Sequence, residues 1–256
     1  MSQTVLITGA TGGIGLEFVK IFASKKATLL LVARNELRLR RMCEKLQARG
    51  LEADYVACDL GDPDSPAKIA AHAEQEGMKV DILINNAGFG DYGPFAEANL
   101  QKQLDMIDLN VRALTEMTGL FLPGMIARGS GKILNVGSIA SFEPGPMMSV
   151  YYATKAYVLS FSEALTRELK GTGVTVTCLC PGPTNTGFTA GAGMTQKRFA
   201  DIFSLTGPAS VASYGYKALM RGQAVAVHGL PSKIGAFGVR LLPRKAVREL
   251  VYRLQK

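Results

Sequence analysis

Short apolar segments alternate with helix-like segments along almost the whole chain, and this alternation limits the fold more than any other feature. Seven segments rich in β-branched and aliphatic residues have the length and composition of buried strands. They are Val5–Thr8, Thr28–Val32, Asp54–Ala57, Ile82–Asn85, Lys132–Val136, Val174–Leu179 and Ala224–Val227. Helical periodicity lies between them, notably in Glu36–Ala48, Pro66–Glu76, Leu100–Ala127, Val150–Lys170 and Pro208–Met220. The alternation predicts an α/β fold: a doubly wound, mostly parallel seven-stranded sheet with helices on both faces.

The length of the chain predicts one domain over residues 1–256, because α/β folds of this size often remain single and no linker or internal repeat interrupts the pattern. The first expected strand begins within five residues of Met1, and no apolar span reaches 18 residues. We therefore expect a cytoplasmic protein with reduced thiols.

A glycine-rich turn follows the first expected strand. The segment Thr8-Gly9-Ala10-Thr11-Gly12-Gly13-Ile14-Gly15 precedes a helix-like pattern in Leu16–Phe22. Glycines between a strand and a helix permit a tight turn and let backbone N–H groups approach a pyrophosphate. The spacing is G-x-x-x-G-x-G, so the usual dinucleotide fingerprint is not matched, and the Gly-Lys-Ser/Thr of a nucleoside triphosphate loop is missing. The alternative is a turn that needs glycine only for its backbone conformation.

Tyr151 and Lys155 form a second candidate site. Residues four apart share one face of a helix, so the phenol and the ammonium can converge on one point. A free tyrosine has a pKa near ~10, and a nearby ammonium lowers that pKa by favouring the phenolate. The pair therefore suits proton exchange with a carbonyl or alcohol oxygen.

Seven motifs stand in one order along the chain. They are Thr8-Gly9 to Gly15, Asn85-Asn86-Ala87-Gly88, Asn110, Ser138, Tyr151, Lys155 and Pro181-Gly182. Their order and spacing, from about residue 4 to residue 186, resemble the classical short-chain dehydrogenase/reductase family. The resemblance implies a Rossmann-type sheet, a nicotinamide cofactor and hydride transfer to or from a carbonyl carbon.

The resemblance also implies a catalytic set and a set of cofactor contacts. The implied catalytic residues are Asn110, Ser138, Tyr151 and Lys155. The implied cofactor contacts are Gly9, Thr11, Gly13, Ile14, Gly15, Asp59, Asn86, Gly88, Tyr151, Lys155, Pro181, Gly182 and Thr186. Among them, Asp59 would accept from the adenine amino group, or would serve only as a turn residue ahead of Asp62-Pro63. Asn86 and Gly88 would line the adenosine ribose, and Thr186 would hold the nicotinamide carboxamide.

Two neighbouring residues compete with the catalytic assignments. Ser138 follows the fifth expected strand, where ligands of open α/β sheets bind, and would orient the substrate carbonyl. Ser141 is a rival hydroxyl, but the spacing of thirteen residues to Tyr151 selects Ser138. Tyr152 is a rival phenol, but its partner four residues on is Ala156 and not a lysine.

The implied mechanism is a proton relay beside a hydride transfer. Tyr151 protonates the carbonyl oxygen, Lys155 lowers the pKa of Tyr151 and binds the nicotinamide ribose, and a chain from Lys155 through Asn110 and water restores the proton. Asn110 would bend its helix, or would be a buried polar bridge between helix and sheet. Two other functions stay open: a catalytically silent NADP-binding sensor or scaffold, and a dehydratase or epimerase, for which 256 residues leave little room.

Arg34 indicates which cofactor is preferred. It follows the second expected strand, where many NAD-dependent relatives carry an acidic residue, and Ala33 offers no carboxylate. A guanidinium can bind a ribose 2′-phosphate, so we expect NADP(H). Gly12 stands where some NADP-preferring relatives have a second basic residue, which leaves NAD(H) open. Arg34 could also be an ordinary exposed arginine.

Metal and nucleophile chemistry have little support in the sequence. The four cysteines, Cys43, Cys58, Cys178 and Cys180, form no C-x-x-C, and we expect Cys178 and Cys180 to share one face of a buried strand. The two histidines, His72 and His228, do not stand in a catalytic context, which disfavours a Ser-His-Asp hydrolase. We therefore expect no metal site.

The C-terminal extension, residues 228–256, is strongly basic. Seven lysines and arginines stand there against Glu249, so it carries +6 of the chain's net +8. Val247, Leu250, Val251 and Leu254 recur with helical spacing and predict an amphipathic helix. This helix either packs on the body with a solvated basic face, or contacts an anionic membrane or an acyl-carrier partner. No recognition motif supports nucleic-acid binding.

The substrate is predicted only as a class. Ten apolar residues lie on expected loops around the crevice: Phe89, Tyr92, Phe95, Phe142, Pro144, Met147, Met148, Phe188, Met194 and Phe199. They favour a hydrophobic small-molecule ketone or aldehyde, such as a 3-oxoacyl chain or a steroid-like carbonyl. Residues 187–205, rich in small residues, would be a mobile lid. Relatives of this fold pair long helices, so Leu100–Ala127 and Val150–Lys170 would form a homodimer or homotetramer.

Overall fold

The seven predicted strands form one parallel sheet. The structure is a computed structural model, and it describes residues 2–188, 192 and 205–255. The strands are β1 (Thr4–Thr8), β2 (Thr28–Ala33), β3 (Ala53–Ala57), β4 (Val80–Asn85), β5 (Gly131–Val136), β6 (Val174–Cys180) and β7 (Val225–Val227). Their order is β3-β2-β1-β4-β5-β6-β7, with every neighbouring pair parallel. The order reverses beside β1, which creates the switch point at which ligands of such sheets bind. The predicted fold class is confirmed.

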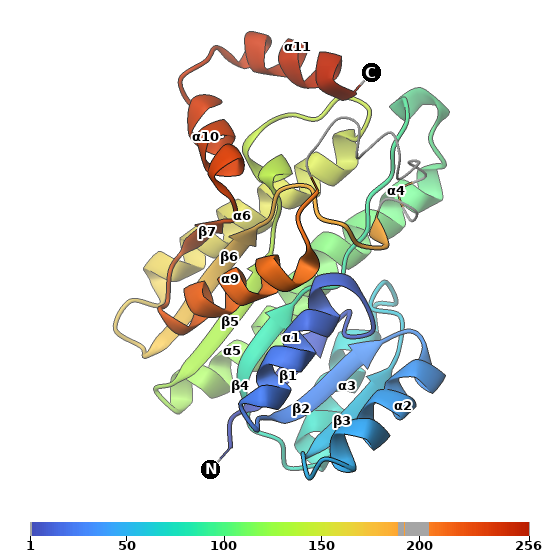
Figure 1. Cartoon of the computed structure of the whole chain (residues 1–256), viewed down its shortest axis with the longest axis vertical. Coiled ribbons are helices and arrows are strands. Elements are labelled where there is room, and N and C mark those ends of the chain that lie inside the picture. The colour runs from blue at the N-terminus through green and yellow to red at the C-terminus, as the bar shows by residue number, and fades with distance from the viewer. Residues whose placement is uncertain (1, 189–191, 193–204, 256) are drawn as a thin grey trace.

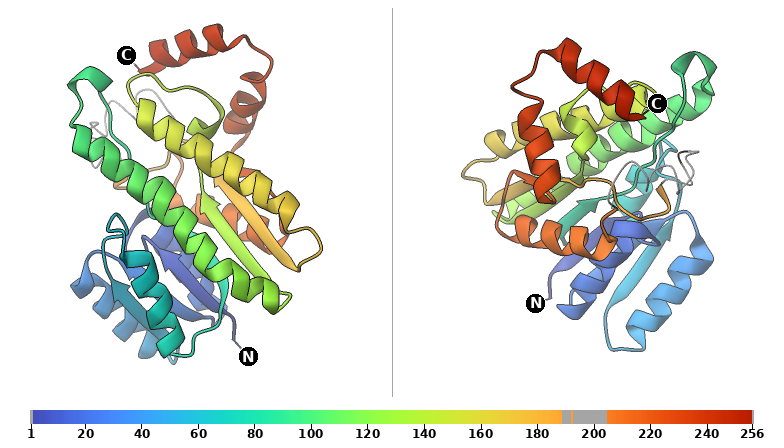
Figure 2. Two further views of the ribbon diagram at one scale, coloured as in Figure 1. Left: turned by 180° about the vertical axis from the view of Figure 1, so that it is seen from behind. Right: turned by 45° about the horizontal axis from the view of Figure 1, so that its top comes forward.

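Helices cover both faces of the sheet (Figures 1 and 2). Those that accompany the sheet are α1 (Gly13–Ser24), α2 (Glu36–Gln47), α3 (Ser65–Gln75), α4 (Leu100–Ile107), α5 (Leu114–Ala127), α6 (Ser149–Glu168) and α9 (Pro208–Met220). Two 3₁₀ turns, η1 (Phe95–Glu97) and η3 (Ile139–Phe142), lie in the loops that follow β4 and β5.

Alternate residues of each strand enter opposite halves of the core. Val5 and Ile7 of β1 pack with side chains of α1, α2 and α9, whereas Leu6 packs with those of α3, α5 and α6. All three are fully buried. Because a strand turns successive side chains to opposite faces, a strand covered on both faces must be apolar throughout. This requirement explains why the unbroken apolar runs in the sequence predicted the strands.

The predicted helix over Leu100–Ala127 is not regular along its length. A π-helical segment, η2 (Asp108–Ala113), stands between α4 and α5, which otherwise run on as one rod (Figure 2). A π-helical segment contains one extra residue, and such segments are frequent at functional sites. Asn110 lies inside it and is 1% exposed. Helical periodicity alone does not reveal such an insertion.

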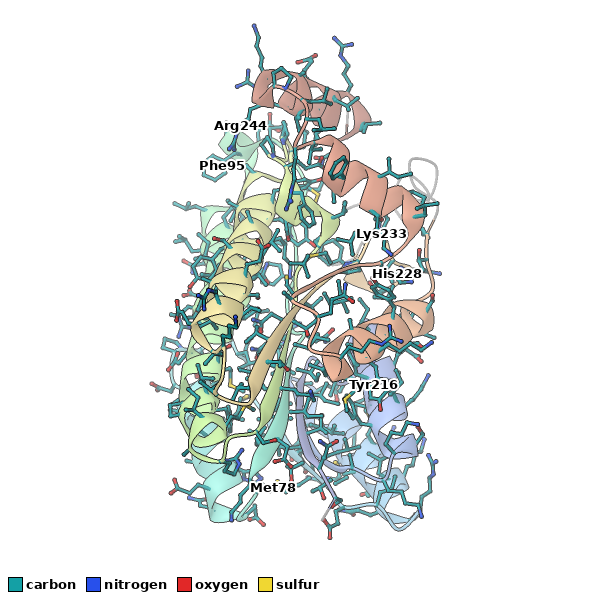
Figure 3. The ribbon with its side chains drawn as sticks, turned by 90° about the vertical axis from the view of Figure 1, so that its left-hand side faces the viewer. Met78, Phe95, Tyr216, His228, Lys233 and Arg244 are labelled. Atoms are coloured by element: carbon teal, nitrogen blue, oxygen red, sulfur yellow. The ribbon has the colours of Figure 1, made fainter. Side chains whose placement is uncertain are left out.

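The C-terminal extension forms two further helices, α10 (Leu230–Gly238) and α11 (Arg244–Gln255), which we call the terminal hairpin. Figure 3 shows Lys233 and Arg244 on it, with His228 at its base. Val247 and Val251 are buried, as predicted, but Leu250 and Leu254 are about half exposed, so the predicted apolar face of α11 is partly wrong. Of the helices in the described ranges, none combines the length and apolarity needed to cross a bilayer.

Candidate active site

The predicted catalytic residues converge at the carboxyl ends of the central strands. Ser138 follows β5, Tyr151 and Lys155 lie in the first turns of α6, and Asn110 lies in η2. The side chains of Ser138, Lys155 and Asn110 are at least nine-tenths buried. Four positions distant in sequence therefore meet in one place because βαβ topology brings strand ends to a common edge.

The Ser138 hydroxyl lies close enough to the phenol of Tyr151 to lower the pKa of that phenol. Its Oγ also accepts from the backbone N–H of Ala140 at 3.1 Å, which orients the hydroxyl as the cap of η3. The rival Ser141 is occupied elsewhere, because its Oγ accepts from the Ser138 backbone N–H at 3.2 Å. The structure thus favours Ser138 as the hydroxyl beside Tyr151.

The acidity of Tyr151 differs from the sequence-based expectation. Burial raises the pKa of Tyr151 to about 12, and the nearby Ser138 hydroxyl opposes this increase. The expectation that Lys155 lowers this pKa is not met, since the Lys155 ammonium lies 5.8 Å from the centroid of the Tyr151 ring and donates instead to the Val136 carbonyl at 2.8 Å. Burial also lowers the pKa of Lys155 itself, to about 8.

Asn110 bridges the loop after β4 and helix α6. Its Oδ1 accepts from the Phe89 N–H at 3.1 Å, and its Nδ2 donates to the Phe89 carbonyl at 2.9 Å and to Thr154 Oγ1 at 3.1 Å. Asn110 is therefore a buried polar bridge, but it joins a loop to helix α6 and not, as the alternative role had it, a helix to the sheet. The sequence analysis did not find Thr154, although its place before Lys155 on the same helix was a usable signal.

Tyr152, the rival phenol, points toward the end of the chain. Its hydroxyl accepts from Gln255 Nε2 at 2.5 Å, and the Gln255 carbonyl accepts from the Tyr92 hydroxyl at 2.5 Å. Gln255 is 6% exposed, so the last turn of α11 closes over the loops beside Tyr151. These contacts join residues more than 100 positions apart, and no sequence motif predicted them.

Apolar side chains surround Tyr151, as predicted. Met148 and Ala192 form a buried cluster with Tyr92, Tyr152 and Phe188 packed against it. The Phe188 ring lies 5.1 Å from the Tyr151 ring, centroid to centroid. Phe95 does not belong to this group, because it lies in η1 and is 57% exposed. Met194, Phe199 and most of the proposed lid, 187–205, lie outside the described residues.

The glycine-rich turn can accommodate an anionic group at the start of α1. Gly9 and Gly13 have φ values of +65° and +51°, which favour glycine. A Cβ on Gly15 would lie 2.3 Å from the Gly9 carbonyl oxygen, so this turn tolerates no side chain there. The helix cap, Gly12, has no side-chain capping bond in the described part of the chain, which leaves the first N–H groups of α1 for a phosphate.

Several predicted cofactor contacts border the same space. A Cβ on Gly88 would lie 2.9 Å from Asn110 Oδ1 and 3.5 Å from Lys155 Nζ, so this glycine leaves room beside these two candidate catalytic side chains. Thr186 lies next to Gly13, at 3.2 Å from its virtual Cβ. Asn86 is held by its Nδ2, which donates to the Thr8 carbonyl at 2.8 Å. The chain's own groups therefore fit a dinucleotide that extends from the glycine-rich turn to Lys155.

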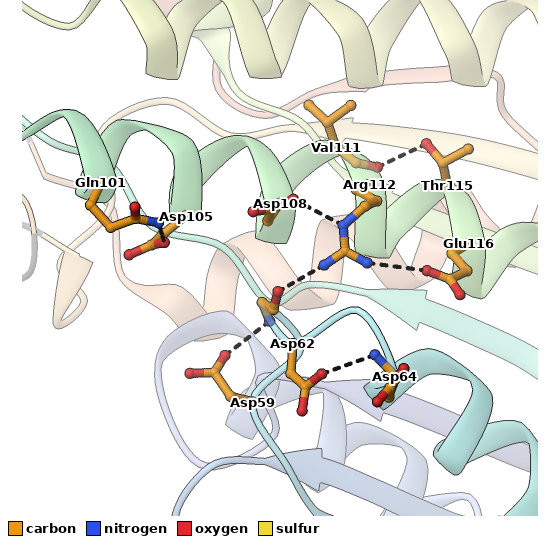
Figure 4. Close-up of polar contacts among 11 residues, drawn as sticks. Asp59, Asp62, Asp64, Gln101, Asp105, Asp108, Val111, Arg112, Thr115 and Glu116 are labelled. Carbon is orange, nitrogen blue, oxygen red and sulfur yellow. Dashed lines mark hydrogen bonds and ion pairs between the residues drawn. The ribbon is translucent and has the colours of Figure 1, made fainter.

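Asp59 and Arg34 lie together at the outer end of this space. Asp59 Oδ1 accepts from the Gly61 N–H at 2.9 Å, so the turn role is present, and its Oδ2 lies 3.9 Å from the Arg34 guanidinium. Arg112 in turn donates to the Gly61 carbonyl at 2.7 Å and to Asp108 at 2.9 Å (Figure 4). Arg112 therefore ties the loop that holds Asp59 to η2, the segment that holds Asn110.

Pro181 and Gly182 follow β6 and lie against η3 and α10. The Pro181 carbonyl accepts from the Ile139 N–H at 2.9 Å, which joins the turn after β6 to η3. A Cβ on Gly182 would lie 2.5 Å from Ser232 Oγ of α10. A side chain at this position would therefore require the Ser232 hydroxyl to turn away.

Several of the cysteines and histidines make contacts that account for them structurally. The Sγ atoms of Cys178 and Cys180 lie 3.7 Å apart on one face of β6, as predicted, and both are buried. His228 Nε2 lies 3.1 Å from Ser210 Oγ, and His72 pairs with Asp54. Within residues 2–188, 192 and 205–255, no three His, Cys, Asp or Glu side chains gather as a metal site requires.

Comparison with known proteins gives consistent matches. The family model described as short chain dehydrogenase matches residues 3–197. The ketoacyl reductase HetN of Nostoc sp. is 34% identical over 218 residues, which cover 85% of this chain and 75% of that protein. A short-chain dehydrogenase from Sphingobium yanoikuyae, solved in complex with NADPH, superposes with a TM-score of 0.83 at 30% identity, covering 93% and 94% of the two chains. A bulky-bulky ketone specific alcohol dehydrogenase from Comamonas testosteroni superposes with a TM-score of 0.79 at 27% identity, covering 93% and 92%.

Proposed function

Because the chain belongs to the short-chain dehydrogenase family, we propose that it transfers a hydride between NADPH and the carbonyl carbon of a hydrophobic ketone or aldehyde, with Tyr151 as general acid and base. Membership makes the chain an oxidoreductase of carbonyl and alcohol groups. The cofactor preference, the substrate class and the catalytic tyrosine are the parts we propose.

One observation carries the proposal: the Ser138 hydroxyl lies close enough to the Tyr151 phenol to lower its pKa, and the Lys155 ammonium lies 5.8 Å from the centroid of the Tyr151 ring. A hydroxyl pair at the carboxyl end of a parallel sheet can hold one carbonyl oxygen between two donors. A pure binding protein has no need of this pair, which disfavours the silent sensor or scaffold.

The proposed roles of the side chains follow from their contacts. A bound nicotinamide would supply or accept the hydride, and this chemistry belongs to the cofactor. Tyr151 donates its proton to the substrate oxygen, and its high pKa keeps the phenol protonated before reduction. Ser138 donates a second hydrogen bond and fixes the carbonyl. Asn110 holds the Phe89 loop and Thr154, and so keeps α6 in position.

Arg34 supports NADP(H) over NAD(H). Its side chain is 81% exposed, and its ion pair with Asp59 is long at 3.9 Å, so the guanidinium can turn toward a 2′-phosphate. The NADPH complex of the Sphingobium relative is consistent with this assignment.

The substrate class follows from the walls around Tyr151. Met148, Tyr92 and Phe188 offer apolar and aromatic surface, which suits a hydrophobic carbonyl compound. The names of the relatives, a ketoacyl reductase and a bulky-ketone alcohol dehydrogenase, agree with a 3-oxoacyl or steroid-like substrate.

The proposed homodimer or homotetramer has exposed apolar residues to support it. Leu104 of α4, Leu120 of α5 and Tyr157 of α6 are each about two-fifths exposed, on the helices expected to pair. Light scattering of the purified protein tests this assignment, and a monomer at working concentration contradicts it.

The decisive experiment compares two neighbouring phenols. NADPH oxidation is followed with a 3-oxoacyl thioester, a steroid ketone and an aryl ketone, using wild type, Tyr151→Phe and Tyr152→Phe. We expect Tyr151→Phe to lower the rate by about 10²–10⁴-fold while NADPH binding persists. Tyr152→Phe is the matched control and should retain most of the rate, because Tyr152 bonds Gln255 instead of Ser138.

The outcomes separate the candidate functions. An unchanged rate in Tyr151→Phe would contradict the assignment of Tyr151 as the general acid and base. NADPH binding with no turnover of any ketone supports the silent sensor, and no binding of either nucleotide removes the enzyme interpretation.

The cofactor assignment has its own measurement. Reduced-nicotinamide fluorescence is titrated with NADPH and with NADH, for wild type and Arg34→Ala. We expect NADPH affinity to fall by about tenfold or more in the variant, since a charge-assisted contact contributes about 1.5–3 kcal/mol. Equal binding of both nucleotides by wild type contradicts the NADP preference only.

A further inference from the structure

The terminal hairpin carries an exposed apolar stripe that the fold does not use. Leu230, Ile234, Phe237 and Leu241 are 70%, 64%, 65% and 71% exposed, respectively. Their spacing of i, i+4, i+7 and i+11 places the first three on one side of α10, with Leu241 in the turn that follows. We call these four residues the α10 stripe.

The helix that carries the α10 stripe is only loosely packed against the core. Ala236 is the one residue of α10 that is buried in the described structure, so α10 contributes little to the core. Single exposed apolar residues are ordinary, but a contiguous row of four marks an interaction surface. Exposing these four apolar side chains to water is unfavourable in free energy, so we expect another apolar surface to cover the α10 stripe.

The surroundings of the stripe are strongly basic. Exposed Lys233 and Arg240 belong to α10 and its following turn, and exposed Arg244, Lys245 and Arg248 belong to α11. Figure 3 shows Lys233 and Arg244 on the two helices. The acidic residue of the hairpin, Glu249, forms an ion pair with Arg253 at 3.0 Å. The surface thus combines large apolar side chains with an excess of positive charge.

We propose that the terminal hairpin docks on an anionic lipid bilayer, with the α10 stripe among the acyl chains and the basic residues at the headgroups. Interfacial helices have this combination of aromatic or aliphatic side chains with lysine and arginine. Anionic headgroups complement the charge, and both contributions act together. No membrane-spanning helix is needed for this mode of binding.

Charge decides between this occupant and two others. A second copy of the chain would place like charges against each other, which opposes pairing through the hairpin. An acidic protein partner would neutralise the arginines and lysines. The four large apolar side chains of the α10 stripe, however, are best covered by a hydrocarbon environment. The bilayer satisfies both requirements.

Docking would place the active site at the lipid surface. The hairpin lies at the carboxyl ends of the strands (Figure 1), and Gln255 of α11 bonds Tyr152, the neighbour of Tyr151. Phe95, exposed in η1, lies at the same end of the molecule (Figure 3). This last step rests on the proposed function: a hydrophobic carbonyl compound dissolved in the membrane would reach the site without crossing water.

Vesicle flotation of the full chain tests the docking itself. The protein is mixed with phosphatidylcholine vesicles, with or without 30% phosphatidylglycerol, at low and high salt. We expect at least tenfold more binding to the anionic vesicles at low salt, and a decline in high salt because exposed charges are screened.

Matched variants assign the binding to the two parts of the surface. Ile234→Ser with Phe237→Ser should lower vesicle binding about tenfold or more, whereas Leu37→Ser, at a position of α2 that is 57% exposed, should not. Lys245→Gln with Arg248→Gln should remove the preference for anionic vesicles, whereas Lys45→Gln with Arg49→Gln, exposed near the end of α2, should not. All seven positions are exposed, so thermal unfolding should stay unchanged and exclude misfolding as the cause.

Three results would overturn the proposal. Wild type that floats with neither vesicle, but co-elutes with a purified acidic acyl-carrier protein, assigns the surface to a protein partner. A mass that halves in Ile234→Ser with Phe237→Ser assigns it to self-association. Binding that is equal in all variants removes the hairpin from the contact. Because flotation requires no substrate, its failure is distinguishable from failure of the proposed enzyme activity.

Discussion

The glycine-rich turn at one end of the candidate site and the terminal hairpin at the other are built in opposite ways. In the turn, backbone meets backbone: a Cβ on Gly15 would meet the Gly9 carbonyl at 2.3 Å. In the hairpin, four side chains, Ala236, Val247, Val251 and Gln255, are buried, and the remainder mostly faces solvent. A site for a rigid dinucleotide needs fixed atoms, whereas a surface that meets a partner needs exposed ones.

The difference also concerns chemistry. Of the proposed catalytic residues, Asn110, Ser138 and Lys155 are buried, and Tyr151 is half-buried. Hydrogen bonds to backbone groups hold the buried ones, as with Lys155 and the Val136 carbonyl. The hairpin contacts this region through Gln255 and Ser232, so it packs over a site whose own residues are fixed by hydrogen bonds. Four measurements can sharpen or break this contrast.

The largest effect is expected in the turn. Gly15→Ala should destabilise the protein by about 3 kcal/mol, because the added methyl group collides with backbone that has nowhere to move. Gly12→Ala is the matched control and should cost less than about 1 kcal/mol, since no atom lies within 4 Å of its virtual Cβ. Urea unfolding measures both. Equal losses would mean that the turn is not the rigid element described.

A smaller and more local effect is expected in the hairpin. Val251→Ala removes two buried methyl groups and should cost about 1–2 kcal/mol. Since few contacts hold α11, we expect faster amide hydrogen exchange there, with little change in β1 or β4. A uniform increase in exchange over the whole sheet would show that the hairpin is part of one cooperative core.

The buried phenol should appear in the pH dependence of stability. The folded pKa of Tyr151, about 12, lies above the value of ~10 in the unfolded chain, so the unfolded chain ionises first as pH rises. This contribution is complete below pH 10 and is lost between pH 10 and 12. Between pH 9 and 11, wild type should lose about 1 kcal/mol more than Tyr151→Phe in urea unfolding. Parallel losses would mean that the phenol is not buried.

The smallest effect has the opposite sign. Gly235→Ala, in α10, should stabilise the protein by about 0.5–1 kcal/mol, because alanine is the better helix former and no atom lies within 4 Å of the virtual Cβ. Thermal unfolding should therefore shift upward slightly. Destabilisation there would reveal a close contact on α10 and would weaken its description as a loosely packed element.

The strands and the shared helix face of Tyr151 and Lys155 were predictable because they depend on local patterns. Buried parallel strands must be apolar on both faces, and Tyr151 and Lys155 share a helix face at any orientation of that helix. The π segment around Asn110 was not predictable, since one inserted residue leaves the apolar pattern of Leu100–Ala127 almost unchanged. Phe95 was misplaced because a loop side chain has no periodicity to fix its direction.

The sequence by itself determined the order of strands and helices, the glycine-rich turn and the spacing of Ser138, Tyr151 and Lys155. The tertiary structure alone decided that burial raises the pKa of Tyr151, that Gln255 closes on Tyr152, and that the α10 stripe faces outward. The physical reason is the distance along the chain over which each effect acts. Propensity and periodicity act over a few residues, whereas burial and contacts between distant segments exist only once the whole chain has packed.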